Sequence, residues 1–136
     1  MQPKSDPSSR GVLTPAKRLV LIIEDDFLTR YTAAEALREM GYLVIEAQDA
    51  AEAMSVFTSG THVDFVFSDI NMPGSLNGLE FAGWLARQHP AVPILLTSGE
   101  PQPAEALGLG KKRHFMAKPY DLDEVDGWLR QMLLVV

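Results

Sequence analysis

The sequence of 136 residues contains no cysteine. This absence excludes a disulfide framework, a thiolate metal site and a cysteine nucleophile, and it fits a reducing compartment. No apolar run reaches the roughly 18 residues of a membrane-spanning helix, and the polar N-terminus lacks the apolar core of a secretory signal. The net charge is −6, so the overall balance does not indicate a nucleic-acid-binding surface. We therefore expect a cytoplasmic protein with no membrane segment and no direct contact with nucleic acid.

Size and composition indicate one globular domain preceded by a tail. Hydrophobic residues make up 46% of the chain and charged residues 22%, both ordinary values for a globular protein. A chain of this length is typical of a single domain. Residues 1–17 are rich in proline and serine and hold too little apolar surface to offset the entropy of ordering. We expect a flexible tail over residues 1–17 and a folded domain over residues 18–136.

From residue 18 onwards, short apolar runs alternate with segments of helical periodicity. The apolar runs predict five strands, at Leu19–Ile23, Leu43–Glu46, Phe65–Ser68, Pro93–Thr97 and His114–Ala117. A parallel sheet built from such β–α units is covered by helices on both faces, so the predicted fold is a doubly wound α/β domain of three layers. Right-handed crossovers place the loops after the strands on one edge, where open α/β sheets bind ligands.

Apolar residues three and four positions apart predict the helices between these strands. Their stripes are Ala33, Ala36, Leu37 and Met40; Ala50, Ala53, Met54 and Phe57; Leu79, Ala82, Gly83 and Ala86; and Val125, Leu129 and Met132. Asp49, with Glu52 three positions later, is expected to cap the second helix. Prolines and glycines between residues 101 and 110 leave room only for a short fourth helix, at about Ala104–Leu107.

Charged and polar residues stand at the ends of four predicted strands. Glu24 and Asp25 follow the first strand, Asp69 the third and Lys118 the fifth, while Thr97 ends the fourth. Taken singly, each has an ordinary explanation, such as a helix cap, a turn, a strand residue or a solvated lysine. Because all five are expected at the same sheet edge, their joint occurrence is hard to attribute to chance.

The residue types at this edge suit a divalent cation and a phosphoryl group. Carboxylates are the hard oxygen ligands that Mg²⁺ prefers, and lysine offers a compact positive charge to a phosphate oxygen. A carboxylate can also act as a nucleophile and form an acyl phosphate, provided that cations balance the phosphoryl charge. A threonine hydroxyl can donate a hydrogen bond to the same group.

Four segments of the sequence resemble the response-regulator receiver domain of the CheY-like superfamily. They are IIEDD at residues 22–26, SDINMPG at 68–74, PILLTS at 93–98 and FMAKPY at 115–120. The resemblance extends from about Arg18 to Leu134, and the order and spacing of the four segments make it specific. It implies a flavodoxin-like (βα)5 domain with the parallel strand order 2-1-3-4-5.

The resemblance also implies a role for each residue at the sheet edge. Asp69 would be the phosphoacceptor, and Lys118 would pair with Asp69 or with its phosphate. Mg²⁺ would be bound by Asp25 and Asp69 directly, by Glu24 through water and by the backbone carbonyl of Asn71. In the active state Thr97 would donate a hydrogen bond to the phosphoryl group, and Phe115 would be the aromatic switch residue. Asp26 would cap the first helix, and the Lys118–Pro119 peptide bond would be cis.

Three departures from the family pattern concern the loops and the output surface. Phe115 stands where many members have tyrosine. The loop at residues 73–78 is one residue longer than usual, and it places Asn77 where aspartate is common. The fourth helix is interrupted by proline and glycine, so the surface that reads the switch is expected to differ from that of other receivers.

The resemblance implies a phosphoacceptor switch of a two-component phosphorelay and not an enzyme with an external substrate. The phosphoryl donor would be a histidine kinase or a histidine phosphotransfer protein. The signal would pass by protein contact through the fourth helix, fifth strand and fifth helix to a target that the sequence does not name. Because the sequence ends after the last helix, we expect a stand-alone receiver, present as a monomer or weak dimer. A receiver cut from a hybrid histidine kinase would have the same features.

Other functional classes are weaker interpretations. An aspartate-nucleophile phosphohydrolase usually needs a second aspartate two residues after the first, where this chain has Asn71, and it needs room for a cap domain. A nucleotide-binding module is disfavoured because Gly108–Lys112 does not match a phosphate-loop spacing. A phosphorylation-independent adaptor would not need the intact set of acids, threonine and lysine. The three histidines, His62, His89 and His114, are scattered and indicate solvated or capping roles.

Overall fold

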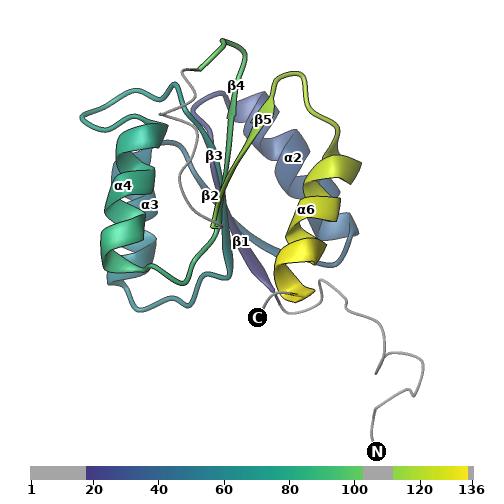
Figure 1. Cartoon of the computed structure of the whole chain (residues 1–136), viewed down its shortest axis with the longest axis horizontal. Helices are drawn as coiled ribbons and strands as arrows, with labels where there is room; N and C mark the ends of the chain where they lie inside the picture. The colour runs from purple at the N-terminus through teal and green to yellow at the C-terminus, as the bar shows by residue number, and fades with distance from the viewer. Residues whose placement is uncertain (1–17, 103–111, 135–136) are drawn as a thin grey trace, which may run out of the picture.

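The computed structural model describes residues 18–102 and 112–134. Two predictions, the tail at residues 1–17 and the short helix at residues 104–107, lie outside these described residues. The chain folds into a central sheet with helices on both sides (Figure 1).

The sheet consists of five parallel strands. They are β1 (Leu19–Ile23), β2 (Leu43–Ala47), β3 (Phe65–Asp69), β4 (Ile94–Ser98) and β5 (Arg113–Ala117). Their order is β2-β1-β3-β4-β5, as the resemblance to receiver domains implies. Each observed strand agrees with its predicted range to within one residue at either end. The register pairs Ile23 with Ser68 and Asp69 with Thr97, so that the carboxyl ends of β1, β3 and β4 lie level at one edge.

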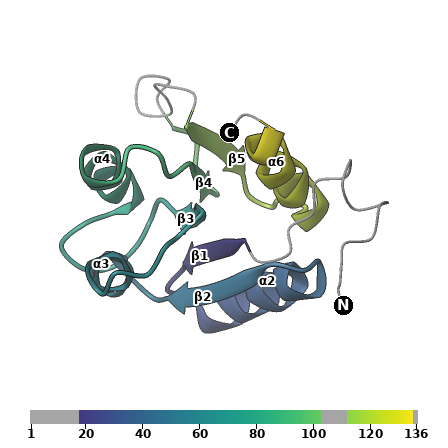
Figure 2. The same ribbon diagram turned by 90° about the horizontal axis from the view of Figure 1, so that it is seen from below.

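Helices cover both faces of this sheet. The helices α2 (Phe27–Glu39) and α6 (Leu122–Leu134) lie on one face, and α3 (Ala50–Thr58) and α4 (Gly78–Gln88) lie on the other (Figures 1 and 2). Successive strand residues point to opposite faces. In β1, for example, Leu21 and Ile23 belong to one buried cluster, and Val20 and Ile22 belong to the second. The doubly wound three-layer fold is therefore confirmed.

Local capping residues fix where the first two helices begin. The carboxylate of Asp26 accepts hydrogen bonds from the backbone N–H and the hydroxyl of Thr29, at 2.8 and 2.6 Å. Asp49 likewise accepts from the N–H of Glu52 at 2.9 Å. Both caps agree with the sequence predictions. The side chain of Glu52 returns to the N–H of Gln48 instead of that of Asp49, at 2.8 Å.

The prediction of which face of α4 is buried is wrong. The buried face is rotated about the helix axis by part of a turn from the predicted one. The residues that the helix buries are Gly78, Phe81, Ala82 and Leu85, whereas Ala86 is exposed. The prediction used only the spacing of apolar residues, and so it treated Gly83 and Ala86 as equivalent to larger side chains. Burial of Phe81 and Leu85 removes far more apolar surface from water, so these two side chains decide which face turns to the core.

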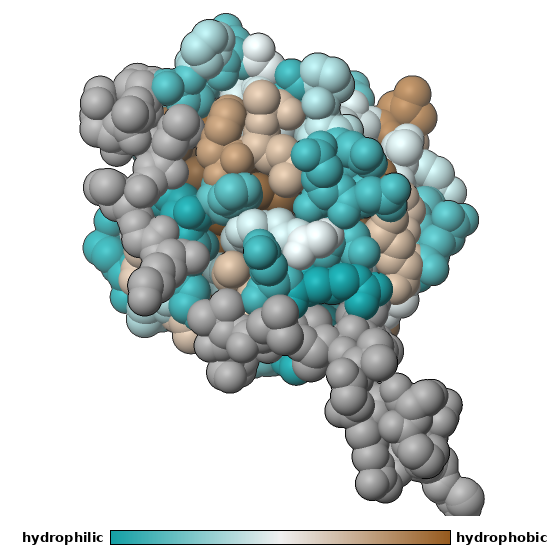
Figure 3. Space-filling model, turned by 45° about the vertical axis from the view of Figure 1, so that its right-hand side comes forward, coloured by the Kyte–Doolittle hydropathy of each residue, from teal (hydrophilic) through white to brown (hydrophobic). Residues whose placement is uncertain are grey.

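Among the described residues, most large hydrophobic side chains are buried or partly buried, and four are exposed. Phe27, Leu28 and Tyr31 are exposed in the first turns of α2, and Leu43 is exposed at the start of β2. In the space-filling view, hydrophobic residues gather in the upper part of the face, at the level of the carboxyl ends of the strands (Figure 3).

None of the helices described is long and apolar enough to cross a membrane.

Candidate functional site

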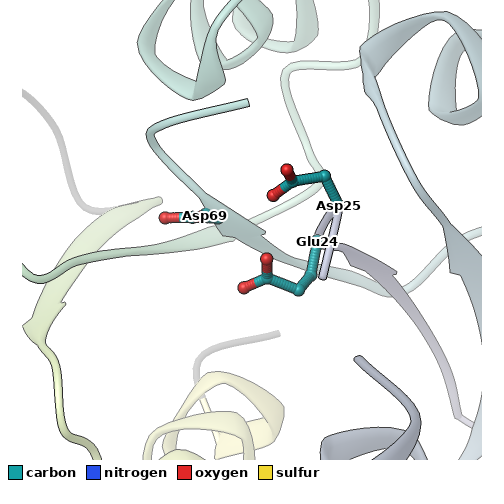
Figure 4. Close-up of side chains that lie close together, drawn as sticks. All are labelled: Glu24, Asp25 and Asp69. Atoms are coloured by element: carbon teal, nitrogen blue, oxygen red, sulfur yellow. The ribbon is translucent and has the colours of Figure 1, made fainter. Parts of the chain in front are cut away.

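The level strand ends bring three carboxylates together. Glu24 and Asp25 directly follow β1, and Asp69 is the last residue of β3. The side chains of Glu24 and Asp25 diverge from the end of β1 and extend towards Asp69 (Figure 4). One oxygen from each of the three carboxylates lies within 4.8 Å of the others.

Burial makes this concentration of negative charge unfavourable. Glu24 and Asp69 are each only 6% exposed, whereas Asp25 is exposed. Burial raises the pKa of Asp69 above its usual value, and the charge of Asp25 raises it further, although Lys118 and the N–H of Asn71 oppose both effects. Burial likewise raises the pKa of Glu24, with a further rise caused by Asp69. The site therefore stabilises a nearby positive charge.

Lys118 supplies one such charge, from the residue after β5. Its Nζ lies 3.2 Å from Oε1 of Glu24 and 3.4 Å from Oδ2 of Asp69. Burial alone lowers the pKa of Lys118, but the charges of Asp69 and Glu24 outweigh this effect and leave the pKa above its usual value. The lysine stays protonated between the two acids, and three carboxylates still face a single ammonium group.

Thr97 contributes an unpaired hydroxyl beside these charges. It pairs in register with Asp69 and is only 3% exposed. Among the described residues, its Oγ1 is the buried side-chain oxygen or nitrogen without a hydrogen-bond partner. Such a group is costly to bury, and a native example calls for an explanation. A hydroxyl that receives its partner only when a ligand is bound would explain it.

The remaining predictions concern Asn71, Phe115 and the Lys118–Pro119 peptide bond. Asn71 has its N–H 3.4 Å from Oδ1 of Asp69, and its side-chain amide donates to Ser98 and Glu100 at 3.4 and 3.2 Å. Phe115, in β5, is partly buried against the cluster that α3 and α4 cover. The peptide bond between Lys118 and Pro119 is cis, as expected.

The sequence analysis did not identify two residues whose hydrogen bonds hold this edge of the sheet in place. Ser98 is buried, and its hydroxyl accepts hydrogen bonds from the N–H of Glu100 at 3.0 Å and from the amide of Asn71. Arg30, on α2, donates from Nη1 to the backbone carbonyl of Glu24 at 2.8 Å. The position of Ser98 directly after Thr97 was an available signal. Arg30 had none, because an arginine in the second turn of a helix usually points to solvent.

The donor set fits Mg²⁺. Three carboxylates offer hard oxygen atoms, and at least one of them, that of Asp25, remains open to solvent for a cation that keeps several waters. The excess of negative charge and the raised pKa values of the buried acids give a divalent cation a favourable place. The three histidines lie elsewhere. His62 contacts Asp64, His89 packs on Phe57 and Trp84, and His114 stacks on Trp128.

Curated proteins of known name are similar in sequence to most of this chain. The chain is 34% identical over 115 residues to the aerobic respiration control protein ArcA of Escherichia coli, which covers 84% of this chain and 48% of ArcA. It is 30% identical over 127 residues to the sensor protein EvgS of the same species, covering 92% of this chain and 10% of EvgS. The chain thus spans about half the length of ArcA, and a small part of EvgS.

A solved structure and a family model agree with these relatives. The response regulator protein TrrA of Thermotoga maritima, solved in complex with Mg²⁺–BeF, superposes with a TM-score of 0.73 at 27% identity and covers 85% of this chain and 98% of that one. The family model for the response regulator receiver domain matches residues 20–130, which is most of the chain. With the strand order and the acidic edge already established, the chain belongs to the response regulator receiver domain family.

Proposed function

We propose that this receiver domain is a phosphorylation-dependent switch that accepts a phosphoryl group on Asp69. The observation that carries the proposal is the position of Asp69, a buried carboxylate held 3.4 Å from the ammonium group of Lys118 and beside two further acids. The unpaired hydroxyl of Thr97, in register with Asp69, supports it independently. The resemblance of ArcA and TrrA to this chain is in keeping with such a role.

The chemistry follows from the charges at the sheet edge. An oxygen of the Asp69 carboxylate attacks the phosphorus of a phosphohistidine and forms an acyl phosphate. The phosphorus–nitrogen bond breaks, and its electron pair returns to the imidazole of the donor. Lys118 stays beside the transferring oxygens and offsets their negative charge. The hydroxyl of Thr97 then donates a hydrogen bond to a phosphoryl oxygen and so gains the partner that it lacks in the unphosphorylated protein.

We assign the cation to the acidic cluster. Asp25 and Asp69 would hold Mg²⁺ directly, Glu24 would reach it through water, and Asn71 would offer its backbone carbonyl. When bound, Mg²⁺ supplies the positive charge that lets carboxylates and phosphoryl oxygens lie side by side. The folded unit that carries this chemistry is proposed to begin at residue 18, since β1 begins at Leu19 and the family match begins at residue 20.

Phosphorylation would be read through a change at Thr97 and Phe115. The phosphoryl group adds about −1.5 to −2 charges at neutral pH. Recruitment of the Thr97 hydroxyl to this group shifts the end of β4, and the partly buried ring of Phe115 on β5 can follow it. The output is proposed to pass through the surface around β5 and α6 to a protein target.

This proposal is tested by phosphorylation with a small donor. Incubation with acetyl phosphate and Mg²⁺ is expected to add one phosphoryl group per chain, and chelation of Mg²⁺ is expected to prevent it. Intact-protein mass spectrometry measures both results. Absence of any phosphoryl group at saturating Mg²⁺ would overturn the proposal.

A cation effect on stability is expected from the same cluster. Mg²⁺ that binds only the folded state at about 100 times its dissociation constant stabilises the fold by about 2.7 kcal/mol. Asp25→Asn is expected to remove most of this gain, and Asp26→Asn to preserve it, since Asp26 caps α2 and asparagine is an equally good cap. Urea unfolding with and without Mg²⁺ measures the difference. Equal gains in both variants would place the cation elsewhere.

The phosphoryl donor is proposed to be a histidine kinase or a histidine phosphotransfer protein. The exposed side chains of Phe27, Leu28 and Tyr31 stand immediately after the acidic segment that ends β1. Phe27 and Tyr31 stack with ring centroids 5.8 Å apart. An exposed apolar group next to a phosphoacceptor favours a protein donor that docks there over a small metabolite.

Replacement of one of these side chains should separate the two kinds of donor. Leu28→Glu is expected to slow transfer from a phosphohistidine protein by about tenfold or more, because an apolar contact at an interface becomes a charge. Transfer from acetyl phosphate is expected to stay unchanged. Leu43→Glu is the matched control, because Leu43 is similarly exposed but lies at the opposite end of the sheet. Equal slowing by both substitutions, or by neither, would remove Leu28 from the docking surface.

One observation favours a second candidate, in which the receiver domain is part of a larger protein. EvgS, of which the match covers 10%, is a sensor protein. This supports, as a second candidate, a receiver that belongs to a larger hybrid sensor. The phosphoacceptor chemistry is the same in both cases, and only the source of the phosphoryl group differs.

A further inference from the structure

We propose that Arg30 is a positioning residue for the cation site: it fixes the peptide group between Glu24 and Asp25 and thereby aims the Asp25 carboxylate at the cation. The inference rests on the proposed function and adds to it a residue of α2 that is not among the proposed ligands of the cation or of the phosphoryl group.

Arg30 is held in one geometry by two contacts at its guanidinium end. Nη1 donates to the backbone carbonyl of Glu24 at 2.8 Å, and Nε donates to Oε1 of Glu46 at 3.2 Å. The side chain is only 15% exposed. From α2, Arg30 therefore connects the end of β1 with the neighbouring strand β2. It does so through two nitrogens of its planar guanidinium group, an arrangement that lysine cannot reproduce.

Asp25 needs such support more than the other two acids do. Glu24 accepts from the N–H of Asp26 at 3.0 Å and contacts Lys118, and Asp69 contacts Lys118 and the N–H of Asn71. Among the described residues, no hydrogen bond or ion pair holds the exposed carboxylate of Asp25. Its direction is therefore set by the backbone on either side.

Both peptide groups that flank Asp25 are fixed by hydrogen bonds. The carbonyl of Glu24, which precedes Asp25, accepts from Arg30, and the N–H of Asp26, which follows it, donates to Glu24. Loss of the Arg30 contact frees the first peptide group to rotate, which swings the Asp25 side chain. A small swing is sufficient, because Mg²⁺ demands nearly ideal octahedral geometry.

The support extends away from the site along α2 and β2. Glu46, the second partner of Arg30, also contacts Arg38 at 3.3 Å. Arg38 in turn donates to the carbonyl of Val44 at 3.1 Å and contacts Glu35 at 2.6 Å. Arg30 is thus the member of this charged network that reaches the site, and Arg38 is a member of the same network that does not.

Charge and position predict opposite results for the loss of Arg30. A positive side chain near the site repels a divalent cation, so its removal would tighten Mg²⁺ binding if charge alone mattered. If Arg30 positions Asp25, its removal weakens binding. Substitution of groups that orient metal ligands typically lowers metal affinity by about 10–100-fold.

The test is calorimetric titration of Mg²⁺ into the wild-type chain and four variants. Arg30→Met is expected to weaken binding by about tenfold or more. Arg30→Lys keeps the charge but not the fork, and it is expected to weaken binding by several-fold. Arg38→Met and Arg38→Lys are the matched controls, expected within twofold of the wild type. Binding by both Arg30 variants that is as tight as wild type, or tighter, would overturn the inference.

The wild-type titration and one further measurement separate the possible failures. If the wild-type chain itself binds no Mg²⁺, the proposed function fails, and this inference fails with it. If wild-type binding is intact, rates of phosphorylation by acetyl phosphate should show a higher half-saturating Mg²⁺ concentration for Arg30→Lys, with the saturated rate within about twofold of wild type. A lower saturated rate at an unchanged half-saturating concentration would contradict a positioning role. If Arg30→Met does not fold, the Mg²⁺ affinities of Arg30→Lys and Arg38→Lys are compared instead, and this comparison alone tests the inference.

Discussion

Asp69→Asn is expected to abolish phosphorylation by acetyl phosphate completely. The substitution keeps the shape of the side chain at the end of β3 but replaces a carboxylate with a neutral amide that cannot form the acyl phosphate. Lys118 retains Glu24 as its partner at 3.2 Å, so the surrounding site keeps its arrangement. Mass spectrometry after incubation with Mg²⁺ and acetyl phosphate measures the result.

The neighbouring acids provide the controls for this loss. Asp26→Asn changes the same functional group one residue from the cluster, preserves the cap of α2 and is expected to be phosphorylated at the wild-type rate. Full phosphorylation of Asp69→Asn would instead assign the acceptor to another residue, with Asp25 as the nearest accessible carboxylate.

Loss of phosphorylation in Asp69→Asn should not reflect loss of the fold. Burial raises the pKa of Asp69 in the folded state above its unfolded value. A raised pKa favours folding below the unfolded pKa, and this contribution is lost as the pH rises through the folded pKa. Above the folded pKa the ionised carboxylate therefore opposes folding, and a neutral asparagine relieves this effect. In Mg²⁺-free buffer the variant should unfold at the wild-type temperature or above it.

The sheet edge was predictable because its signals are local. Each strand is a short apolar run that stops at a charged or polar residue, and parallel topology then decides which ends meet. The caps at Asp26 and Asp49 follow from the same kind of short-range pattern. The local signals do not pair the side chains. The resemblance implied that Lys118 pairs with Asp69, but the contact of Lys118 with Glu24, 94 positions away in the sequence, is visible only in the folded chain.

The failures of prediction have physical causes of two kinds. The stripe of α4 was misplaced because periodicity alone treats small and large apolar residues alike, whereas burial of Phe81 and Leu85 decides the orientation. Arg30 was missed because its partner is a backbone carbonyl, and a backbone group leaves no trace in the sequence. The charged residues of the site were visible, and the residues that hold them in place were not.

Gly78→Ala is expected to cost about 3 kcal/mol of stability or more, the largest effect foreseen for a single methyl group in this domain. Gly78 is the first residue of α4, and its N–H donates to the carbonyl of Ile70 at 2.7 Å. A Cβ there would lie 2.6 Å from Cα of Ile70 and against the carbonyl oxygen of Asp69. Both obstacles are backbone, so neither can rotate away, and the start of α4 must move off the end of β3.

The other glycines in the helices make this prediction specific. Gly83 lies within α4, and a Cβ there would meet only the flexible end of Arg87, at 3.5 Å, while a Cβ at Gly127 in α6 would meet nothing within 4 Å. Alanine at either position is expected to stabilise the domain by about 0.5–1 kcal/mol, because alanine loses less backbone entropy in a helix. Urea unfolding of the three variants measures the contrast. If Gly78→Ala matched the other two in stability, the close approach of α4 to the phosphoacceptor strand would not constrain the fold. If it destabilises as expected, the same methyl group should also slow phosphorylation, because the backbone that it displaces is that of Asp69.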